Sequence, residues 1–512
     1  MNRKEFIMAN KALRINIVAS LVAFIVNMGI NFVLSPYIIE NIGVDAYGFV
    51  SLANNFINYA SLLTIALNSM AGRFITISLH KSDKESANKY FTSVFIANLI
   101  ISIVLLLVSI LSVIYIEEIV NVPVNILKDV RLLFLLLFIN FIISIIGSTF
   151  SVATFARNKL YLGSLRGIES NIIRAILILV LFIMFKPKVF YLGVVSCIVT
   201  LYTVGFNIFY TKKLLPEIKI KLKYYDLKYV IEIISSGIWN TVTKLGQILL
   251  DGVDLLITNL FLGPIEMGVL AVSKTIPNLI VSIVGTIAGI FSPDFTINYA
   301  KGDQEALLSS IKQSIRIMSV FVNIPVSILI VFGNSFYLLW TPNEDARLLQ
   351  VLSILACLTI VVSGGINCIY NVFTVTNKLK LNSMVVLGTG VLNMLIVFIL
   401  LKTTNLGIFA VAGVSTILSI LRNIVFTAPY GAKCLNLKWN IFYPEIFKGI
   451  LGTIVICCFG YILRKIIVVD SWLSLIYSTA ICGTAGLILN GMVVLSKEEI
   501  VYLKRKFIKR GN

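Results

Sequence analysis

The chain has 512 residues, of which 58% are hydrophobic and only 13% are charged, and its mean hydropathy is +0.95. These values exclude an ordinary soluble domain and indicate a chain made largely of membrane-spanning segments. A formal net charge of +19 would suggest a nucleic-acid-binding protein if the chain were soluble. Here the basic residues concentrate in the loops and termini that would face the cytoplasm. We therefore expect a bilayer with anionic headgroups as partner, and no nucleic acid.

About fourteen apolar runs are long enough to cross a bilayer, which takes roughly 20 residues each. Short connections between them leave little room for a soluble domain. Because a helix satisfies its own backbone hydrogen bonds in lipid, we expect an all-α polytopic membrane protein with both termini in the cytoplasm. The runs begin near residues 14, 44, 91, 130, 164, 189, 229, 265, 317, 347, 383, 407, 445 and 471.

The sequence contains an internal repeat. A shift of 220 positions places polar residues of the first half on like residues of the second half without a gap. The first six runs match the next six, so the copies are parallel repeats, related by an axis along the membrane normal. The matches include Gly43 with Gly263, Gly48 with Gly268, Asn58 with Asn278, Lys81 with Lys301, Asp83 with Asp303 and Glu85 with Glu305, and, at a shift of 219, Asn158 with Asn377 and Lys159 with Lys378.

The repeat divides the chain into four parts. We expect an N-terminal bundle of six spans at residues 1–210 and a basic cytoplasmic linker at 211–228. A C-terminal bundle of six spans follows at 229–430, and two further spans with a basic cytoplasmic tail occupy 431–512. A chain built as two similar membrane halves is typical of a transporter whose site lies between the halves.

Several runs carry polar side chains at steps of three or four residues, the spacing of one helix face. Both halves direct equivalent faces toward something polar, which predicts a water-accessible cavity between two bundles. The run from residue 229 carries Asn240, Lys244, Gln247, Asp251, Asp254 and Thr258; the first run carries Asn27 and Asn31, the second Asn54 and Asn58, its repeat partner Lys274 and Asn278, and the fifth Arg166, Ser170 and Arg174.

The charges in these runs have two interpretations. A charge at the centre of a spanning helix costs about 2.5–3.5 kcal/mol on insertion scales, so it normally faces the bundle interior. There it contacts a substrate, or it pairs internally, as Lys244 with Asp251 two turns further on. The alignment of the polar faces across the repeat favours a substrate. The Asn residues of the first two runs fit sugar contacts and interhelical hydrogen bonds equally well.

Covalent chemistry finds no support in the sequence. The phosphate-binding pattern Gly-x-x-x-x-Gly-Lys-Ser/Thr is absent, and the single histidine, His80, falls in a predicted loop. No metal-ligand spacing or catalytic triad can be assembled from one histidine. We therefore expect a protein that moves a molecule without transforming it, and neither an enzyme nor a protein with a bound cofactor.

The 6+6+2 arrangement and the basic interior resemble the multidrug/oligosaccharidyl-lipid/polysaccharide flippase superfamily. Within it the chain looks most like the Wzx-like bacterial flippases of O-antigen or capsule repeat units. The resemblance rests on the segments Asn31 to Tyr37, Gly43 to Gly48 and Arg157 to Lys159, and it covers nearly the whole chain. It implies a V-shaped central cavity that opens alternately to either side. It also implies an undecaprenyl-pyrophosphate-linked oligosaccharide as substrate, flipped to the outer leaflet of the bacterial inner membrane.

The polar residues fit such a substrate. A cationic cavity lowers the cost of moving a pyrophosphate across the membrane. We expect contacts with the pyrophosphate or with acidic sugars from Lys244, Lys274 and Arg174, and headgroup capture at the cytoplasmic helix ends by Arg73, Arg157 and Arg166. Amides both donate to and accept from sugar hydroxyls, and this role falls to Asn27, Asn31, Asn54, Asn58 and Gln247.

Two carboxylates, Asp251 and Asp254, would repel a pyrophosphate. They either bind H⁺ or Na⁺ and couple flipping to an ion gradient, or neutralise Lys244. The competing functions are a lipid II flippase, a multidrug or cation antiporter and a membrane scaffold for glycan assembly. A glycan polymerase and its assembly machinery are the protein partners to expect. The identity of the glycan, the coupling ion and the oligomeric state are not encoded in these patterns.

Overall fold

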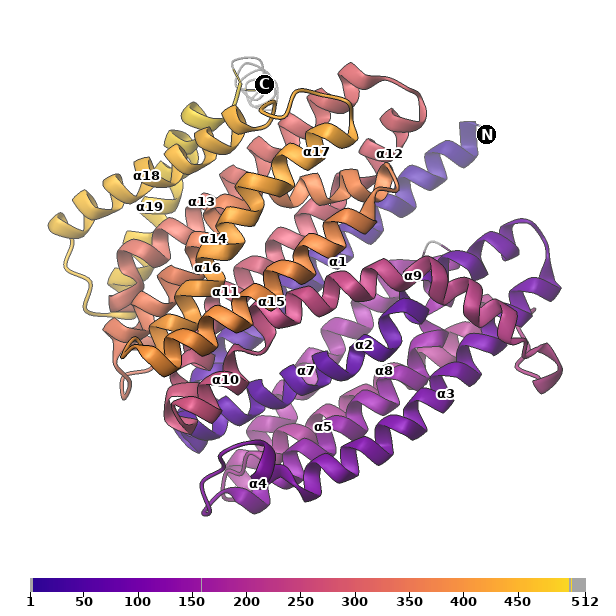
Figure 1. The fold of residues 1–512 in the computed structure, drawn as a ribbon, viewed down its shortest axis with the longest axis horizontal. Coiled ribbons are helices and arrows are strands. Elements are labelled where there is room, and N and C mark those ends of the chain that lie inside the picture. The colour runs from indigo at the N-terminus through magenta and orange to yellow at the C-terminus, as the bar shows by residue number, and fades with distance from the viewer. Residues whose placement is uncertain (1–2, 158, 497–498, 500–512) are drawn as a thin grey trace. The chain divides into compact units, whose positions relative to one another are not determined.

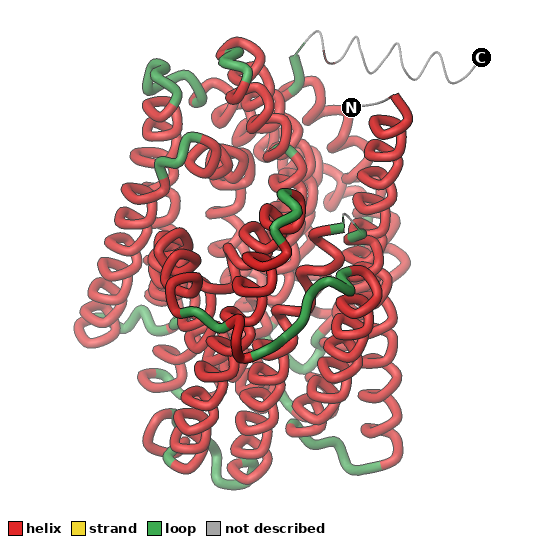
Figure 2. Tube along the Cα trace, turned by 90° about the vertical axis from the view of Figure 1, so that its right-hand side faces the viewer, coloured by secondary structure: helices red, strands yellow, loops and turns green. Residues whose placement is uncertain are grey.

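The computed structural model describes residues 3–157, 159–496 and 499 of the chain. The side chains it describes are those from Val22 onward, except at 80, 290, 293, 297 and 300, together with Ile15 and Ala19. Within these ranges the chain is helical, without strands, and its loops are short connections (Figure 2). Thirteen helices of the described part are long and apolar enough to cross a membrane. The expected all-α polytopic fold is thereby confirmed.

The run expected from residue 229 is the one that falls outside these thirteen. It forms helix α9 (Leu227–Gln247), and its polar face lowers its mean hydropathy. By packing, the chain divides into two compact units, the first being Met1–Ile248 with Leu255–Gly268 and the second Leu249–Asp254 with Val269–Asn512. This division does not coincide with the repeat boundary expected at 211–228. The expected domain limits and the V-shaped cavity stay predictions.

The first unit is built from long helices joined by short turns (Figure 1). Its helices are α1 (Arg3–Ile42), α2 (Val44–His80), α3 (Lys84–Ile114), α4 (Ile116–Ile119), α5 (Leu127–Ser148), α6 (Val152–Ala156), α7 (Leu160–Met184), α8 (Phe190–Leu214) and α9, with α10 (Asp254–Phe261) beginning at the unit boundary and short 3₁₀ turns at Thr149–Ser151 and Leu222–Tyr224.

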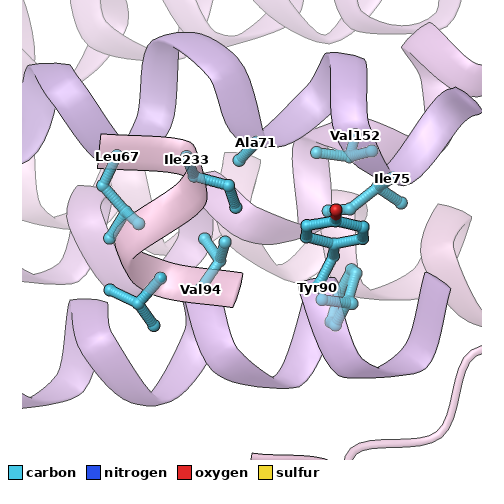
Figure 3. Close-up of a cluster of buried hydrophobic side chains, with 9 residues drawn as sticks. Leu67, Ala71, Ile75, Tyr90, Val94, Val152 and Ile233 are labelled. Carbon is cyan, nitrogen blue, oxygen red and sulfur yellow. The ribbon is translucent and has the colours of Figure 1, made fainter. Parts of the chain in front are cut away.

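Helix α9 belongs to the first unit because its apolar face packs on α2 and α3. Ile233 of α9 lies in a buried cluster with Leu67 of α2 and Val94 of α3 (Figure 3). The approach of the two backbones is close at Gly237, where an added Cβ would lie 2.1 Å from the carbonyl oxygen of Ala66. The basic linker before α9 therefore does not separate it from the first six spans.

The second unit holds the remaining helices. They are α11 (Pro264–Ile290), which begins in the first unit, and α12 (Ser292–Ala300), α13 (Gln304–Trp340), α14 (Ala346–Val375), α15 (Leu379–Thr403), α16 (Ile408–Arg422), α17 (Ala428–Cys434), α18 (Tyr443–Ile466) and α19 (Trp472–Val494), with two π-helical turns at Ile248–Gly252 and Asn423–Thr427.

The two helices beyond the repeat, α18 and α19, pack on α13. Phe332 of α13, Ile456 of α18 and Cys482 of α19 share one buried cluster. Asn323 of α13 donates to the carbonyl of Gly449 in α18 at 2.8 Å and to Oδ1 of Asn490 in α19 at 3.1 Å. An interhelical amide network of this kind holds the helices against one another, because lipid offers its donors no water as an alternative hydrogen-bond acceptor.

An ion-pair cluster closes the same three-helix group beyond the last helix. Arg316 of α13 contacts Glu445 of α18 at 3.2 Å and both carboxylate oxygens of Glu499 at 2.9 Å. Partial burial raises the pKa of Glu499, but hydrogen bonds from Arg316 and Ser496 lower it by more, so that the net pKa is below its usual range. The carboxylate is therefore held charged beside Arg316.

The turns explain why polar residues match across the repeat. Gly43 and Gly263 have φ of 87° and 114°, and Ser82 and Gly302 have φ of 60° and 71°, values in the left-handed region. Asp83 accepts a hydrogen bond from the Ser86 amide at the start of α3. Asp303 accepts one from the Ala306 amide at the start of α13. These bonds with Ser86 hold the pKa of Asp83 below its usual value. Most of the matched skeleton thus forms helix caps and turns.

Two matched glycines allow α2 and the first turn of α11 to touch. A Cβ on Gly48 would lie 2.9 Å from the Cα of Gly268, and a Cβ on Gly268 would lie 2.5 Å from the carbonyl oxygen of Val44. Nearby, Asn121 and Asn259 exchange three hydrogen bonds of 2.7–3.0 Å, which tie α10 to the segment after α4. These contacts hold the turn between α10 and α11 in the first unit.

Candidate functional site

The polar run of α9 and α10 is not one continuous helix face. The spacing of Lys244, Asp251 and Asp254 fits a regular α-helix, but the backbone forms a π-helical turn over Ile248–Gly252 before α10 begins at Asp254. A π turn takes more residues than an α turn, so the side chains that follow are rotated away from the expected face. The expectation of one continuous stripe therefore does not describe this segment, whose second half points elsewhere.

The carbonyl groups released by this π turn are capped by one amide. Asn393 of α15 is fully buried, and its Nδ2 donates to the carbonyls of Leu249 at 3.2 Å and Leu250 at 3.0 Å. Backbone carbonyls without a partner would cost several kcal/mol in lipid, since no water reaches them. The π turn is thus a supported feature of the second unit.

Two charged residues of the second unit, Lys274 and Asp254, form an ion pair. Nζ of Lys274 in α11 donates to a carboxylate oxygen of Asp254, and it lies 3.4 Å from the backbone carbonyl of Asp251. The Asp254 side chain is 1% exposed and that of Lys274 is 19% exposed. Lys274 is therefore engaged with a carboxylate from its neighbouring helix, which the sequence spacing did not indicate.

A proline and a serine shape α11 just beyond Lys274. Pro277 has no N–H, so the carbonyl of Ser273 has no partner within the helix. The hydroxyl of Ser353 in α14 donates to this carbonyl at 2.8 Å, and Tyr337 of α13 contacts the same hydroxyl at 2.6 Å. This buried chain fixes the turn of α11 that carries Lys274.

The environment of Lys244 differs from that of Lys274. It is half-buried in α9, and its ammonium makes no hydrogen bond or ion pair to any residue that the structure describes. The expected pairing of Lys244 with Asp251 is not among the ion pairs of the described residues. Gln247, one turn further, is exposed. On the same helix Asn240 donates to the hydroxyl of Ser69 in α2 at 3.3 Å.

Three predicted site residues of the first unit form a chain of hydrogen bonds. Nη2 of Arg174 in α7 donates to Oδ1 of Asn31 in α1 at 2.5 Å, and Asn31 donates to the carbonyl of Asn27 at 3.0 Å. Nε of Arg174 is buried and has no acceptor within the described residues. At the repeat shift of 219, Arg174 corresponds to Asn393. Both contact the first helix of their own repeat.

The asparagines of α2 are exposed. Asn54 donates to the carbonyl of Val50 one turn back at 2.9 Å, and the carbonyl of Asn58 accepts from Ser61 at 2.6 Å. Neither amide forms a hydrogen bond to another helix within the part of the chain that the structure describes. Their exposure in the first unit is compatible with a wetted face.

Two of the three arginines expected at helix ends hold neighbouring segments. Arg157 pairs with Glu217 at 2.5 Å and donates to the carbonyl of Leu214 at 3.1 Å, which pins the linker after α8. Arg166 pairs with Glu169 at 2.6 Å and stacks on the ring of Phe206, 4.6 Å from its centre.

Arg73, the third of these arginines, is exposed on α2.

One cation that we did not assign to the site lies in the second unit. Arg422 ends α16, directly before the second π-helical turn, and its Nη2 lies 3.4 Å from the hydroxyl of Tyr370. Nε and Nη1 of this arginine are buried without an acceptor in the part of the chain that the structure describes. The sequence signal was its position inside an apolar run.

These units define a polytopic membrane protein with charged and amide side chains inside its helical units. Residues 13–296 match the polysaccharide biosynthesis protein family. The chain is also 30% identical over 499 residues to the uncharacterized membrane protein EpsK of Bacillus subtilis (strain 168), covering 97% of this chain and 98% of that protein. The chain belongs to the polysaccharide biosynthesis protein family.

Solved structures share the fold. The lipid II flippase MurJ in an inward closed conformation aligns with a TM-score of 0.66 over 93% of this chain and 97% of that chain, at 14% identity. A multidrug resistance MATE family transporter of the MOP superfamily, in an inward-facing conformation, aligns with a TM-score of 0.63 over 81% of this chain and 94% of that chain, also at 14% identity. At this identity the likeness establishes the fold.

Proposed function

We propose that this protein flips undecaprenyl-pyrophosphate-linked oligosaccharide repeat units across the bacterial inner membrane by alternating access, for assembly of a surface polysaccharide such as O-antigen or capsule. Family membership supports a role in polysaccharide biosynthesis, and the fold supports a transporter. In this proposal both termini are cytoplasmic, and a glycan polymerase receives the product.

The observation that carries the proposal is the state of Lys244. A lysine within the bilayer is costly unless it finds a counter-charge or water. Lys244 has no carboxylate partner among the described residues, and its repeat equivalent, Phe24, is apolar. A charge retained without a structural partner indicates a transient anionic partner. The pyrophosphate of a lipid-linked sugar is such an anion, and it enters from the membrane itself.

By the same reasoning, the other cations have different roles in substrate binding. Arg174 is held by Asn31, so the two present a donor and an amide together to a polar headgroup. Arg157 is already bound to Glu217 and Leu214, and headgroup capture by this residue would have to break those contacts. Arg73 is therefore the entry residue that best fits the proposal.

Ion coupling is part of the proposal and rests on the carboxylates. Asp254 is engaged with Lys274, whereas Asp251 is exposed at the π turn. We expect Asp251 to take up H⁺ or Na⁺ if flipping is coupled to an ion gradient. Asp251→Asn should then abolish the sensitivity of export to an ionophore. An unchanged ionophore response in this variant would contradict the coupling.

The test of function is the sidedness of the lipid-linked glycan. Cells depleted of the protein are converted to spheroplasts and probed with a membrane-impermeant lectin. Lipid-linked repeat units should accumulate on the inner face and reach the outer face on re-expression. Lys244→Ala should fail to restore exposure, Lys244→Arg should restore it, and Lys402→Ala, which changes an exposed lysine of α15, should behave as wild type.

Other results would redirect the assignment. Restoration by Lys244→Ala at normal membrane levels would remove the residue that carries the proposal. Loss of viability together with stalled cell-wall precursors would indicate a lipid II flippase. A fall in drug tolerance without a stalled glycan would indicate an antiporter.

A further inference from the structure

The second unit contains a guanidinium group whose hydrogen-bonding capacity is only partly used. Arg422 has five N–H donors, and Tyr370 is the acceptor that the structure gives to one of its nitrogens. Its Nε and Nη1 are buried and lack an acceptor among the described residues. Because leaving a charged donor unpaired in a dry interior is expensive, these nitrogens must meet water or an anion.

The guanidinium is held in place from one side. The hydroxyl of Tyr370 donates to Oδ1 of Asn423 at 2.8 Å, which leaves its oxygen lone pairs to accept from Nη2 of Arg422 at 3.4 Å. Asn423 is 1% exposed and opens the π-helical turn Asn423–Thr427. The chain from Asn423 through Tyr370 to Arg422 orients the cation, which is what a preformed anion site requires.

The second unit also contains a carboxylate whose hydrogen-bonding capacity is unused. The backbone carbonyl of Asp251 lies 3.4 Å from Nζ of Lys274, which places this residue beside the buried ion pair. Lys274 is occupied by Asp254, whereas the carboxylate of Asp251 is exposed and makes no hydrogen bond to any residue that the structure describes. Asp251 therefore supplies a negative charge in the same unit as Arg422 and makes no hydrogen bond to it.

Each of these two groups lies at a π-helical turn. Asp251 lies within Ile248–Gly252, and Arg422 directly precedes Asn423–Thr427. Such turns often mark functional positions, because they present side chains that a regular helix would turn away. In the described part of the chain these are the two π-helical turns, and they carry opposite charges.

We propose that Arg422 is the principal contact of the second unit for the phosphate of the substrate, and that Asp251 acts as its counter-ion while the site is empty. The arriving phosphate replaces the carboxylate beside Arg422, so Asp251 competes with the substrate and limits its affinity. This inference rests on the proposed function, since it supposes an anionic lipid substrate. It replaces Lys274 by Arg422 as the main cation, because Lys274 is engaged with Asp254.

The proposal predicts a pattern of affinities rather than one loss. Full-length protein in nanodiscs of neutral lipid is titrated with undecaprenyl pyrophosphate and, separately, with undecaprenol, which has no charge. Arg422→Gln should weaken pyrophosphate binding roughly tenfold to a hundredfold, the range for a lost charged hydrogen bond, and leave undecaprenol binding unchanged. Tyr370→Phe keeps the ring and removes the orienting hydroxyl, and it should weaken pyrophosphate binding several-fold.

The counter-ion role is tested by a double-mutant cycle. Asp251→Asn should tighten pyrophosphate binding by about tenfold, because the carboxylate that competes with the phosphate for Arg422 is removed. In the Arg422→Gln background the same change should have little effect, since there is no cation left to compete for. Asp294→Asn, which removes an exposed carboxylate of α12, is the matched control and should change neither affinity.

The outcomes separate the inference from the function on which it rests. If the wild type does not distinguish undecaprenyl pyrophosphate from undecaprenol, the proposed function fails and the inference falls with it. If the wild type does distinguish them and Arg422→Gln binds equally well, the inference alone is overturned. Tightening by Asp251→Asn that persists without Arg422 would also overturn the counter-ion role. Arg422→Lys, with retained charge, guards against misfolding and should lose less affinity than Arg422→Gln.

Discussion

The ion pair of Lys274 and Asp254 makes a quantitative prediction about stability. The change is Lys274→Met, which keeps the length of the side chain and removes its charge. Asp254 is 1% exposed, so the remaining carboxylate has almost no access to water. Breaking a buried pair from one side costs about 3–5 kcal/mol, because an uncompensated charge stays in the interior. We expect Lys274→Met to lie near the upper end of that range.

The reverse change should cost less. Asp254→Asn leaves an ammonium group whose side chain is 19% exposed and can reach water or a neighbouring acceptor. The double variant Lys274→Met/Asp254→Asn removes both charges, and buried pairs replaced by neutral side chains are often no less stable than the original. We expect the double variant to recover most of the loss and to be at least about 2 kcal/mol more stable than Lys274→Met alone.

The assay is thermal unfolding in one detergent, followed by size-exclusion chromatography after heating. The order of midpoints should be wild type and double variant highest, Asp254→Asn next and Lys274→Met lowest. A double variant as unstable as Lys274→Met would refute the pairing. The same set separates stability from the proposed transport, because a stable double variant that fails to restore glycan exposure assigns Lys274 or Asp254 to that function.

Three further features give predictions. Asn393→Leu removes the amide that caps Leu249 and Leu250 and should lower the free energy of unfolding by about 1–3 kcal/mol, measured by thermal unfolding. Gly268→Ala should destabilise by about 1–3 kcal/mol because its Cβ would meet a backbone carbonyl at 2.5 Å, whereas Gly285→Ala in open space on the same helix should be neutral or stabilising. Because the pKa of Glu499 is lowered, its contact with Arg316 stabilises the protein at neutral pH, and this stabilisation is lost as the pH falls through the lowered pKa. Between about pH 6 and pH 3.5, the melting midpoint of Glu499→Gln should therefore fall less than that of wild type.

The sequence was sufficient for the fold and for the places where helices turn. Apolar runs of spanning length leave few alternatives to transmembrane helices. The matches of Gly43 with Gly263 and of Asp83 with Asp303 are explained by positive φ and by N-caps, which depend on one residue and its immediate neighbours. Local chemistry of this kind can be read without tertiary contacts.

The arrangement of the charges could not be predicted in the same way. The spacing of the polar residues from Asn240 to Asp251 fits an α-helix. The local sequence does not predict the π turn, because the amide that supports it belongs to Asn393 on α15. The partner of Lys274 depends on how α10 and α11 face each other, which pairwise spacing does not contain. Arg157, whose headgroup capture stays a prediction, pairs with Glu217 in the structure, a partner that the sequence did not indicate.

The repeat allows one segment to be compared with itself. Between Asn27 and Gly43 the first copy is an unbroken stretch of α1, whereas the second copy, between Gln247 and Gly263, contains a π turn and a bend. The two stretches have the same number of residues, so the difference is one of conformation and not of an inserted residue. The two copies of this helix in the repeat are therefore a continuous version, in α1, and a version interrupted by a π turn. Straightening the second copy would rotate Asp251 about its helix axis relative to Gln247, and would do so without lengthening the loop at Gly263.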